Sequence, residues 1–244
     1  IQNLTFYHFH VWQDCKVRGS DKMLDFGFYN MDCMEGMKEF PDKYFELAIV
    51  DPPYGIGQSG HKNDTRSKLA TAKLYKPFHG EDKEPPSEEY FNELFRVSKN
   101  QIIWGANHFI SRMPRDSHCW IVWDKVNGGT DYADCELAWT SFKTAVRQFT
   151  YKWQGMLQEN MKSKEIRIHP TQKPVALYEW MLTNYGTTGD KILDTHVGSA
   201  SSLIACHNMG FDYIGFELDK DYWKAATERL EAVKSQTTLW EGIR

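Results

Sequence analysis

Apolar residues occur along this chain in two alternating patterns. Residues 45–50 form a largely apolar run that ends at an Asp-Pro dipeptide, as is typical of a strand buried on both faces. Residues 87–98 instead place apolar side chains three and four positions apart behind Ser87, a residue type that caps helices. The first pattern predicts a strand and the second predicts a helix.

The same alternation continues to the end of the chain. It predicts further strands at residues 26–31, 101–104, 120–123, 137–142, 191–194 and 213–216, and further helices at 34–40, 174–184, 201–208 and 222–234. Turn residues at 127–131 favour antiparallel pairing of the two strands that flank them. Strands that alternate with helices indicate an α/β fold, in which ligands bind at the carboxyl ends of parallel strands.

Composition is that of one sizeable globular domain. The chain has 244 residues, of which 41% are hydrophobic and 25% are charged. Residues 1–23 show no strand or helix period, so we interpret them as a tail of unknown role and residues 24–244 as a single domain. No apolar run reaches the length of a membrane helix, and the first residues do not resemble a secretory signal. We therefore expect a cytoplasmic protein without a membrane partner.

The five cysteines are widely spaced and form no CxxC pair, which favours free thiols over a zinc site. We expect no bound metal. The net charge is -4, yet basic residues are concentrated at 61–76 and 143–173. Two solvated loops are enough to explain this clustering of basic residues. The alternative is a basic face that binds nucleic acid.

A short loop rich in small residues follows the strand predicted at 191–194. Gly198, Ser199, Ala200 and Ser201 lie in it, and the next strand ends at Glu217. Small residues allow the backbone to approach a ligand, and an acid at a strand end can accept both hydroxyls of a ribose. The loop is not a GxGxxG fingerprint, so alone it is a weak signal.

Two other strings are more specific. His169-Pro-Thr171-Gln-Lys173-Pro174 places a hydroxyl and an ammonium at a helix start, where an anion can be held. Asp51-Pro52-Pro53-Tyr54 follows the apolar run at 45–50 and offers a carboxylate beside a backbone carbonyl fixed by prolines. A carboxylate and a carbonyl together can accept both N–H groups of an amine. Each string alone is also explained by a helix cap or by a turn.

Taken together, these strings resemble motifs of the β-class (permuted) DNA amino methyltransferases, and most closely those of phage-type N6-adenine DNA methyltransferases. The resemblance covers about residues 26–234 and includes the permuted order, with Asp51 before the cofactor loop. It implies a Rossmann-like S-adenosylmethionine-dependent methyltransferase fold with a seven-stranded mixed sheet, helices on both faces and an antiparallel strand in the last hairpin. Thr195, His196 and Ala200 depart from the family's usual Pro, Phe and second Gly.

The resemblance also implies site residues. It assigns methyl transfer to Asp51, Pro52, Pro53 and Tyr54. It assigns S-adenosylmethionine, which leaves as S-adenosylhomocysteine, to Asp32, Cys33, Asp51, Thr171, Lys173, Asp194, His196, Gly198, Ser199, Ala200, Ser201, Glu217 and Leu218. DNA recognition falls to loops 56–78 and 143–168, with Lys62, Arg66, Lys68, Lys73, Arg147, Lys152 and Trp153 as candidate contacts.

The implied chemistry is direct displacement. Asp51 and the Pro52 carbonyl grip the amine of an extruded base, Tyr54 stacks on that base, and no nucleophilic cysteine is needed. Adenine N6 in DNA is the first candidate. Cytosine N4, an RNA or protein substrate, and a non-catalytic nucleic-acid-binding subunit remain alternatives. The sequence leaves open a homodimer and a cognate restriction nuclease as partners.

Overall fold

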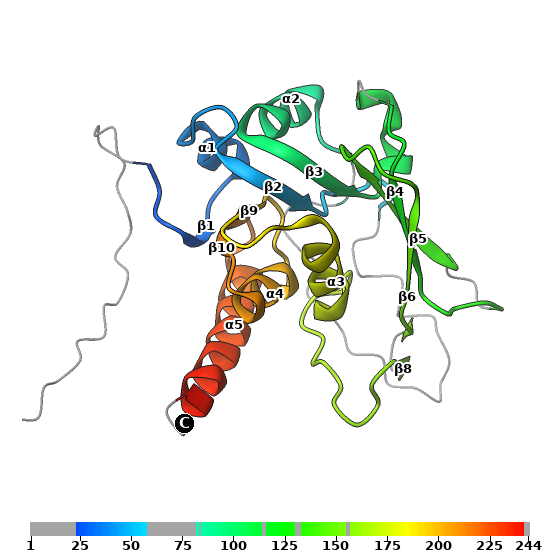
Figure 1. The fold of residues 1–244 in the computed structure, drawn as a ribbon, viewed down its shortest axis with the longest axis vertical. Coiled ribbons are helices and arrows are strands. Elements are labelled where there is room, and N and C mark those ends of the chain that lie inside the picture. The colour runs from blue at the N-terminus through cyan, green and yellow to red at the C-terminus, as the bar shows by residue number, and fades with distance from the viewer. Residues whose placement is uncertain are drawn as a thin grey trace, which may run out of the picture.

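The computed structural model describes residues 23–57, 82, 84–113, 116–129, 133–154 and 157–241, with side chains up to residue 236. The predicted tail, apart from Met23, therefore lies outside the described residues. So does most of the loop predicted at 56–78, including Lys62, Arg66, Lys68 and Lys73. Figure 1 shows the described part as a central sheet with helices on two sides.

The elements follow the predicted order. They are β1 (Gly27–Asn30), α1 (Cys33–Lys38), β2 (Phe45–Val50), α2 (Glu88–Val97), β3 (Ser98–Trp104), η2 (Ala106–His108), η3 (Ile110–Arg112), β4 (Trp120–Asp124), β5 (Cys135–Thr140), β6 (Arg147–Thr150), β7 (Trp153–Gln154), β8 (Leu157–Gln158), α3 (Val175–Tyr185), β9 (Lys191–Asp194), α4 (Ser201–Met209), β10 (Asp212–Glu217) and α5 (Lys220–Glu241). Strands β2 and β9 have the predicted bounds. Among the described helices, none is both long and apolar enough to cross a membrane.

The main sheet has eight strands in the order β1-β10-β9-β2-β3-β5-β4-β6. Its neighbouring strands are parallel except at β5, which runs antiparallel to both β3 and β4. The predicted mixed sheet with an antiparallel hairpin strand is thus confirmed. The expected count of seven strands is corrected to eight, because β6 pairs with the outer edge of β4. Strands β7 and β8 form a separate antiparallel pair.

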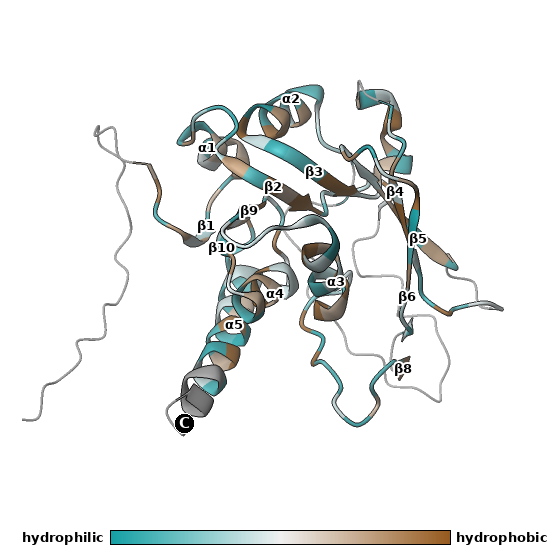
Figure 2. Ribbon diagram, viewed as in Figure 1, coloured by the Kyte–Doolittle hydropathy of each residue, from teal (hydrophilic) through white to brown (hydrophobic). Residues whose placement is uncertain are grey.

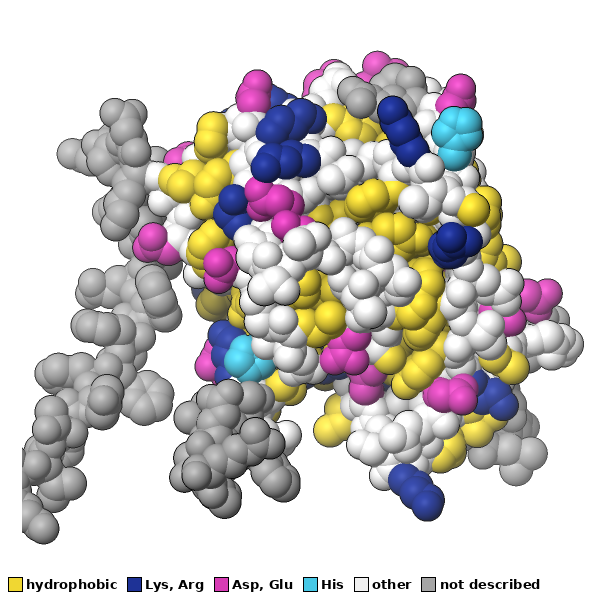
Figure 3. All heavy atoms as spheres, in the orientation of Figure 1, with side chains coloured by type: hydrophobic (Ala, Val, Ile, Leu, Met, Phe, Trp, Pro, Cys, Tyr) yellow, Lys and Arg dark blue, Asp and Glu magenta, His cyan; other side chains and the backbone are white. Residues whose placement is uncertain are grey.

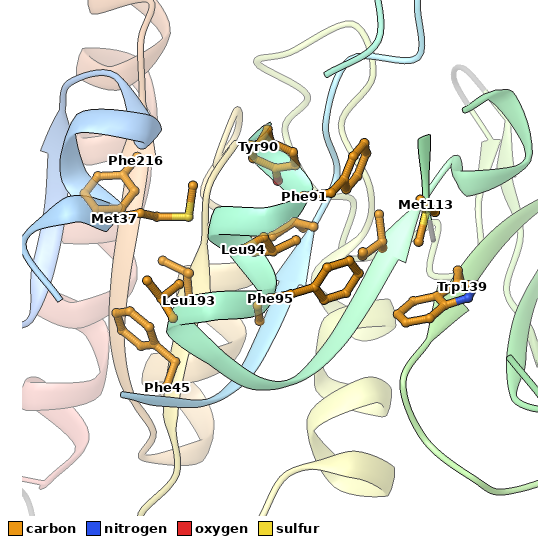
Figure 4. Packing of buried hydrophobic residues seen from close by; sticks show 14 of the residues in the cluster. Met37, Phe45, Tyr90, Phe91, Leu94, Phe95, Met113, Trp139, Leu193 and Phe216 are labelled. Atoms are coloured by element: carbon orange, nitrogen blue, oxygen red, sulfur yellow. The ribbon is translucent and has the colours of Figure 1, made fainter. Parts of the chain in front are cut away.

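The sheet is covered on both faces. Helices α1 and α2 lie on one face, and α3, α4 and α5 lie on the other (Figure 1). Successive residues of β2 serve both layers, since Ala48 and Val50 pack beneath α2 while Leu47 and Ile49 pack towards α3. In Figure 4, side chains of α2 point onto the sheet. This arrangement explains the uninterrupted apolar run that predicted a strand buried on both faces.

The helices are two-sided, as their sequence pattern requires. Figure 2 shows hydrophilic and hydrophobic residues on the same helices, whereas the ends of the central strands are strongly hydrophobic. Parallel strands β1, β10, β9, β2 and β3 end at one edge of the sheet, with Asn30 beside Glu217 and Asp194 beside Gly215. The candidate residues from distant parts of the sequence therefore meet at this carboxyl edge.

Candidate active site

Asp51 directly follows β2, a strand that lies between β9 and β3 in the sheet. Strand β2 pairs in parallel with β9 on one side and with β3 on the other. Asp51 therefore emerges beside the small-residue loop that follows Asp194 and beside the turn at Gly105. Pro52 is buried, and no donor among the described residues occupies its carbonyl. A carboxylate and a free carbonyl lie one residue apart, as the amine-gripping hypothesis requires.

Tyr54 orients this carboxylate. Its hydroxyl donates to Asp51 Oδ1 at 2.7 Å. The ring stacks on His108, with centroids 5.1 Å apart, and presses against Gly105, where a Cβ atom would lie 2.0 Å from the ring. Gly105 also has a φ of +68°, so both the space and the backbone favour glycine there. Stacking of Tyr54 on an extruded base stays a prediction.

Lys173 contacts the catalytic carboxylate. Its Nζ donates to Asp51 Oδ2 at 2.5 Å and to Tyr54 Oη at 3.1 Å, and it lies 3.2 Å from Glu136 Oε2. An ammonium has three N–H donors, and these contacts use all three. In this structure the ammonium is directed to the acidic pair of Asp51 and Glu136, and the expected contact of Lys173 with the methionine carboxylate of the cofactor stays a prediction.

Glu136 is a member of this cluster that the sequence did not single out. It lies on β5 and also pairs with Lys125, 3.1 Å away. Burial raises the pKa of the Asp51 carboxyl, and the nearby charge of Glu136 adds to that rise against the opposing charge of Lys173. Burial alone would lower the pKa of Lys173, but Asp51 and Glu136 outweigh it and raise that pKa. The lysine is therefore a buried cation between two carboxyl groups.

The loop after β9 is fixed to the end of β10. The amide of Gly198 donates to Glu217 Oε2 at 2.8 Å, and the amide of Asp219 donates to Glu217 Oε1 at 2.9 Å. A carboxylate has about four acceptor positions, and three backbone amides, those of Gly198, Asp219 and Leu218, interact with this one. Acceptor capacity therefore remains for a ligand hydroxyl, at the position where a ribose would be held.

Asp194 anchors the base of the same loop. Its carboxylate accepts from the His196 amide at 2.9 Å and from the Ser202 hydroxyl at 2.5 Å. Burial raises the pKa of Asp194 to about 7, the hydrogen bonds notwithstanding. Its position at the end of β9, inside the structure, makes it an anchor for the loop.

The raised pKa predicts a pH-dependent stability. Folded Asp194 binds its proton more tightly than an unfolded aspartate, whose pKa is about 3.9. Its contribution to stability is therefore complete below about pH 4 and is lost as the pH rises to about 7. In urea unfolding without cofactor, the free energy of unfolding of Asp194→Asn, relative to that of the wild type, should rise by up to about 1.4 kcal/mol per pH unit across this window. Parallel pH dependences of the two proteins would refute the shift.

Ala200 adopts the left-handed conformation with a φ of +62°, where the family's usual loop has glycine. Its side chain is fully buried in an apolar cluster with Val197 and Leu203. The added methyl group is therefore accommodated in the core, which explains how this departure is tolerated.

Thr195 and His196, the other two departures, form a hydrogen-bonded group with α2. Thr195 Oγ1 lies 2.6 Å from the Tyr90 hydroxyl and 2.9 Å from His196 Nδ1. Burial lowers the pKa of His196 to about 4, so its imidazole is neutral at physiological pH. Tyr90 was read from the sequence only as part of an apolar helix stripe.

The other predicted cofactor residues lie around the same edge. Asp32 caps α1 by accepting from the Met34 amide at 2.7 Å, and burial raises the pKa of the Cys33 thiol to about 12. Thr171 is exposed, and its Oγ1 lies 3.0 Å from His169 Nδ1. Leu218 is also exposed.

Ser199 and Ser201 are held by Arg229, which donates to the Ser199 carbonyl at 2.6 Å and to the Ser201 hydroxyl at 2.9 Å. Arg229 gave no signal in the sequence.

The candidate DNA contacts of the second basic loop are only partly accessible. Arg147 is exposed at the start of β6, and Lys152 is half-buried. Trp153 is 7% exposed, and its indole N–H donates to the Gln172 carbonyl at 2.8 Å, which corrects its assignment as a DNA contact. On the face shown in Figure 3, basic side chains are interspersed with acidic ones and form no continuous patch.

Residues 111–228 match a family model described as DNA methylase, of the N6/N4 type. The chain is 26% identical to the type II methyltransferase M.HpaI of Haemophilus parainfluenzae, over 82% of this chain and 73% of that protein. It is 24% identical to the putative methylase YubD of Escherichia coli, over 85% of this chain and 91% of YubD. The chain is thus similar to methyltransferases over most of its length and, over residues 111–228, to the DNA methylase family.

Solved structures of methyltransferases share the fold of this chain. The M1.HpyAVI–SAM complex covers 83% of this chain and 98% of its own, with a TM-score of 0.51 and 24% identity. The cytosine-N4-specific PvuII DNA methyltransferase covers 88% and 93%, with a TM-score of 0.52 and 13% identity. The family match includes the cofactor loop and the 169–174 string, whereas Asp51–Tyr54 lies outside it.

Proposed function

We propose that this protein transfers a methyl group from S-adenosylmethionine to an exocyclic amino group of a base in DNA, and that this group is adenine N6. One observation carries the proposal. Asp51 and the loop at 195–200 follow neighbouring parallel strands, β2 and β9, and so lie side by side at the carboxyl edge. A grip for an amine thus lies beside a loop suited to a methyl donor.

The residues present fit the proposed cofactor. Glu217 keeps acceptor capacity for a ribose hydroxyl. Exposed Asp32 lies at the next strand end, because Asn30 pairs with Glu217. Gly198 has a φ of +56°, and a Cβ atom there would lie 3.8 Å from the His169 ring. When bound, S-adenosylmethionine supplies an electrophilic methyl group. Glu217 would hold the sugar of the cofactor, next to the amine site at Asp51.

The catalytic residues act on the amine. Asp51 and the Pro52 carbonyl accept its two N–H hydrogens, which frees the nitrogen lone pair for attack. Tyr54 holds the Asp51 carboxylate in place through its 2.7 Å hydrogen bond. The new N–C bond would form as the sulfonium C–S bond breaks, so positive charge develops on the nitrogen, and the negative charge of Asp51 stabilises it until the surplus N–H proton is lost to solvent.

DNA as the substrate is supported by the matching family model, which is described as DNA methylase, and by the name of the structurally similar PvuII DNA methyltransferase. Segment 143–168 is the described candidate for recognition. It carries exposed Arg147 together with exposed apolar side chains, namely Val146, Leu157, Met161 and Ile166. Cationic side chains neutralise phosphates, and apolar ones can act as wedges between bases. Loop 56–78 remains a second candidate, on its sequence alone.

Adenine is proposed over cytosine because aspartate stands at the first position of the Asp51–Tyr54 motif. Cytosine N4 is the second candidate, since the matching family covers N6 and N4 enzymes and the PvuII relative is cytosine-N4-specific. The amine chemistry is alike at both atoms. Base identity therefore has to come from analysis of the methylated product.

A labelled-methyl assay tests the function. Purified protein and methyl-labelled S-adenosylmethionine are incubated with DNA, alone and with competing RNA or protein. The proposal expects label in DNA that neither competitor reduces. Label in the competitor instead would identify another substrate class. No transfer, together with no cofactor binding in calorimetry, would favour a non-catalytic subunit.

A further inference from the structure

The Lys173 ammonium occupies the position that the proposed chemistry reserves for the target amine. Asp51 Oδ1 accepts from Tyr54, whereas Oδ2 is the carboxylate oxygen that the Asp51–Tyr54 string leaves without a partner and is thus the more accessible acceptor for an incoming N–H group. Lys173 Nζ lies 2.5 Å from Oδ2, with its side chain only 4% exposed. A lysine nitrogen at that distance and a base amine at hydrogen-bond distance compete for the same acceptor.

The surroundings of Lys173 strengthen this comparison. Its Nζ lies 5.6 Å from the centroid of the Tyr54 ring and 5.6 Å from that of Trp104. A cation is attracted to aromatic faces, and so is a planar base. Lys173 is thus held by the carboxylate and by the ring that the proposed function assigns to an extruded base.

Glu136 offers the ammonium a second place. It approaches Lys173 from β5, 3.2 Å from Nζ, and it contacts neither Asp51 nor Tyr54 through any hydrogen bond among the described residues. A buried ammonium that lost its only counter-ion would be strongly destabilised. Because Glu136 is already in contact, Lys173 can release Asp51 and still keep one ion pair.

We propose that Lys173 holds the place of the target amine on Asp51 until a base enters, and that Glu136 then receives its ammonium. Glu136 and Lys173 are positioning residues in this scheme, because they control access to Asp51. The inference rests on the proposed function. It adds the requirement that the incoming base displaces the Lys173 ammonium from Asp51.

Substitution of Lys125 should have the opposite effect to substitution of Glu136. It competes with Lys173 for Glu136, since its Nζ lies 3.1 Å from Glu136 Oε1. Glu136→Gln removes the receiving charge and should retain Lys173 on Asp51. Lys125→Met removes the competitor and should draw Lys173 towards Glu136. A purely structural role of the cluster would make both changes harmful.

The test measures extrusion of the target base directly. A duplex carrying the site that the wild type methylates has 2-aminopurine next to the target base, and fluorescence is read at saturating protein with S-adenosylhomocysteine. We expect Glu136→Gln to reduce the ratio of extruded to stacked base by about tenfold, a usual effect for one pair in a coupled network, and Lys125→Met to raise it. Glu46→Gln is the matched control, because Glu46 pairs with Lys99 and Lys191 at the opposite end of β2.

The outcomes separate the inference from the function. Unchanged extrusion in Glu136→Gln, or shifts of the same sign in both variants, would overturn the inference while wild-type methylation of DNA leaves the function intact. Absence of wild-type methylation would overturn both. If Glu136→Gln does not fold, as judged by thermal unfolding, Lys125→Met alone decides by the sign of its effect.

Discussion

Replacement of Asp51 by alanine is expected to reduce methyl transfer by at least about a thousandfold, the upper range for loss of one group that stabilises transition-state charge. The variant loses both the acceptor for the amine and the negative charge that opposes the developing positive charge. Lys173 keeps Glu136 as a counter-ion at 3.2 Å, so the fold should survive. Single-turnover transfer from labelled S-adenosylmethionine measures the effect.

Cofactor binding separates this result from general damage. Asp51 bonds Tyr54 and Lys173 but no atom of the loop at 195–200 among the described residues, so calorimetry should find nearly unchanged cofactor affinity in Asp51→Ala. Asp42→Ala is a matched control, since Asp42 is an exposed partner of Arg96. Retention of wild-type transfer in Asp51→Ala would eliminate the proposed mechanism.

Glu217→Gln is expected to weaken S-adenosylmethionine binding by about 100-fold. Hydrogen bonds to a charged group contribute roughly 1.5–3 kcal/mol each, and the amide removes one acceptor oxygen and the charge. The change also forces a choice between the amides of Gly198 and Asp219, which the carboxylate now accepts at 2.8 Å and 2.9 Å. Both effects loosen the loop against β10. Isothermal calorimetry gives the dissociation constant.

Glu46→Gln again serves as the control for a glutamate-to-glutamine change, because Glu46 lies at the amino end of β2, away from the carboxyl edge. The cofactor affinity of Glu46→Gln should equal that of the wild type. If Glu217→Gln also binds the cofactor like the wild type, then Glu217 is only a structural tie for the loop, and the ribose assignment is wrong.

The parts of the fold predicted from the sequence are those with strong local signals. Apolar runs at β2 and β9 gave the element bounds because both strands are buried on two faces. The site strings were recognisable because each combines rigid prolines, or small residues, with a polar group at a strand end. Parallel pairing then places strand ends at one edge without any further information.

The parts that were missed depend on tertiary contacts. Strand β6 has a mostly exposed side-chain pattern, so only its backbone pairing with β4 defines it. Glu136 is a single acid on β5, and its function follows from Lys173, which lies 37 residues further along the chain. Trp153 lies in a basic segment, yet its ring packs into the core beside Leu177. A linear pattern does not encode such partners.

One measurement tests the central claim most directly. DNA from cells expressing the wild type, and from cells expressing Asp51→Ala, is digested to nucleosides and analysed by mass spectrometry. We predict N6-methyladenine in the first sample and its absence in the second, with single-molecule sequencing locating the modified site. N4-methylcytosine would shift the assignment to the other exocyclic amine. DNA without any methylated amine in the wild-type sample would contradict the account.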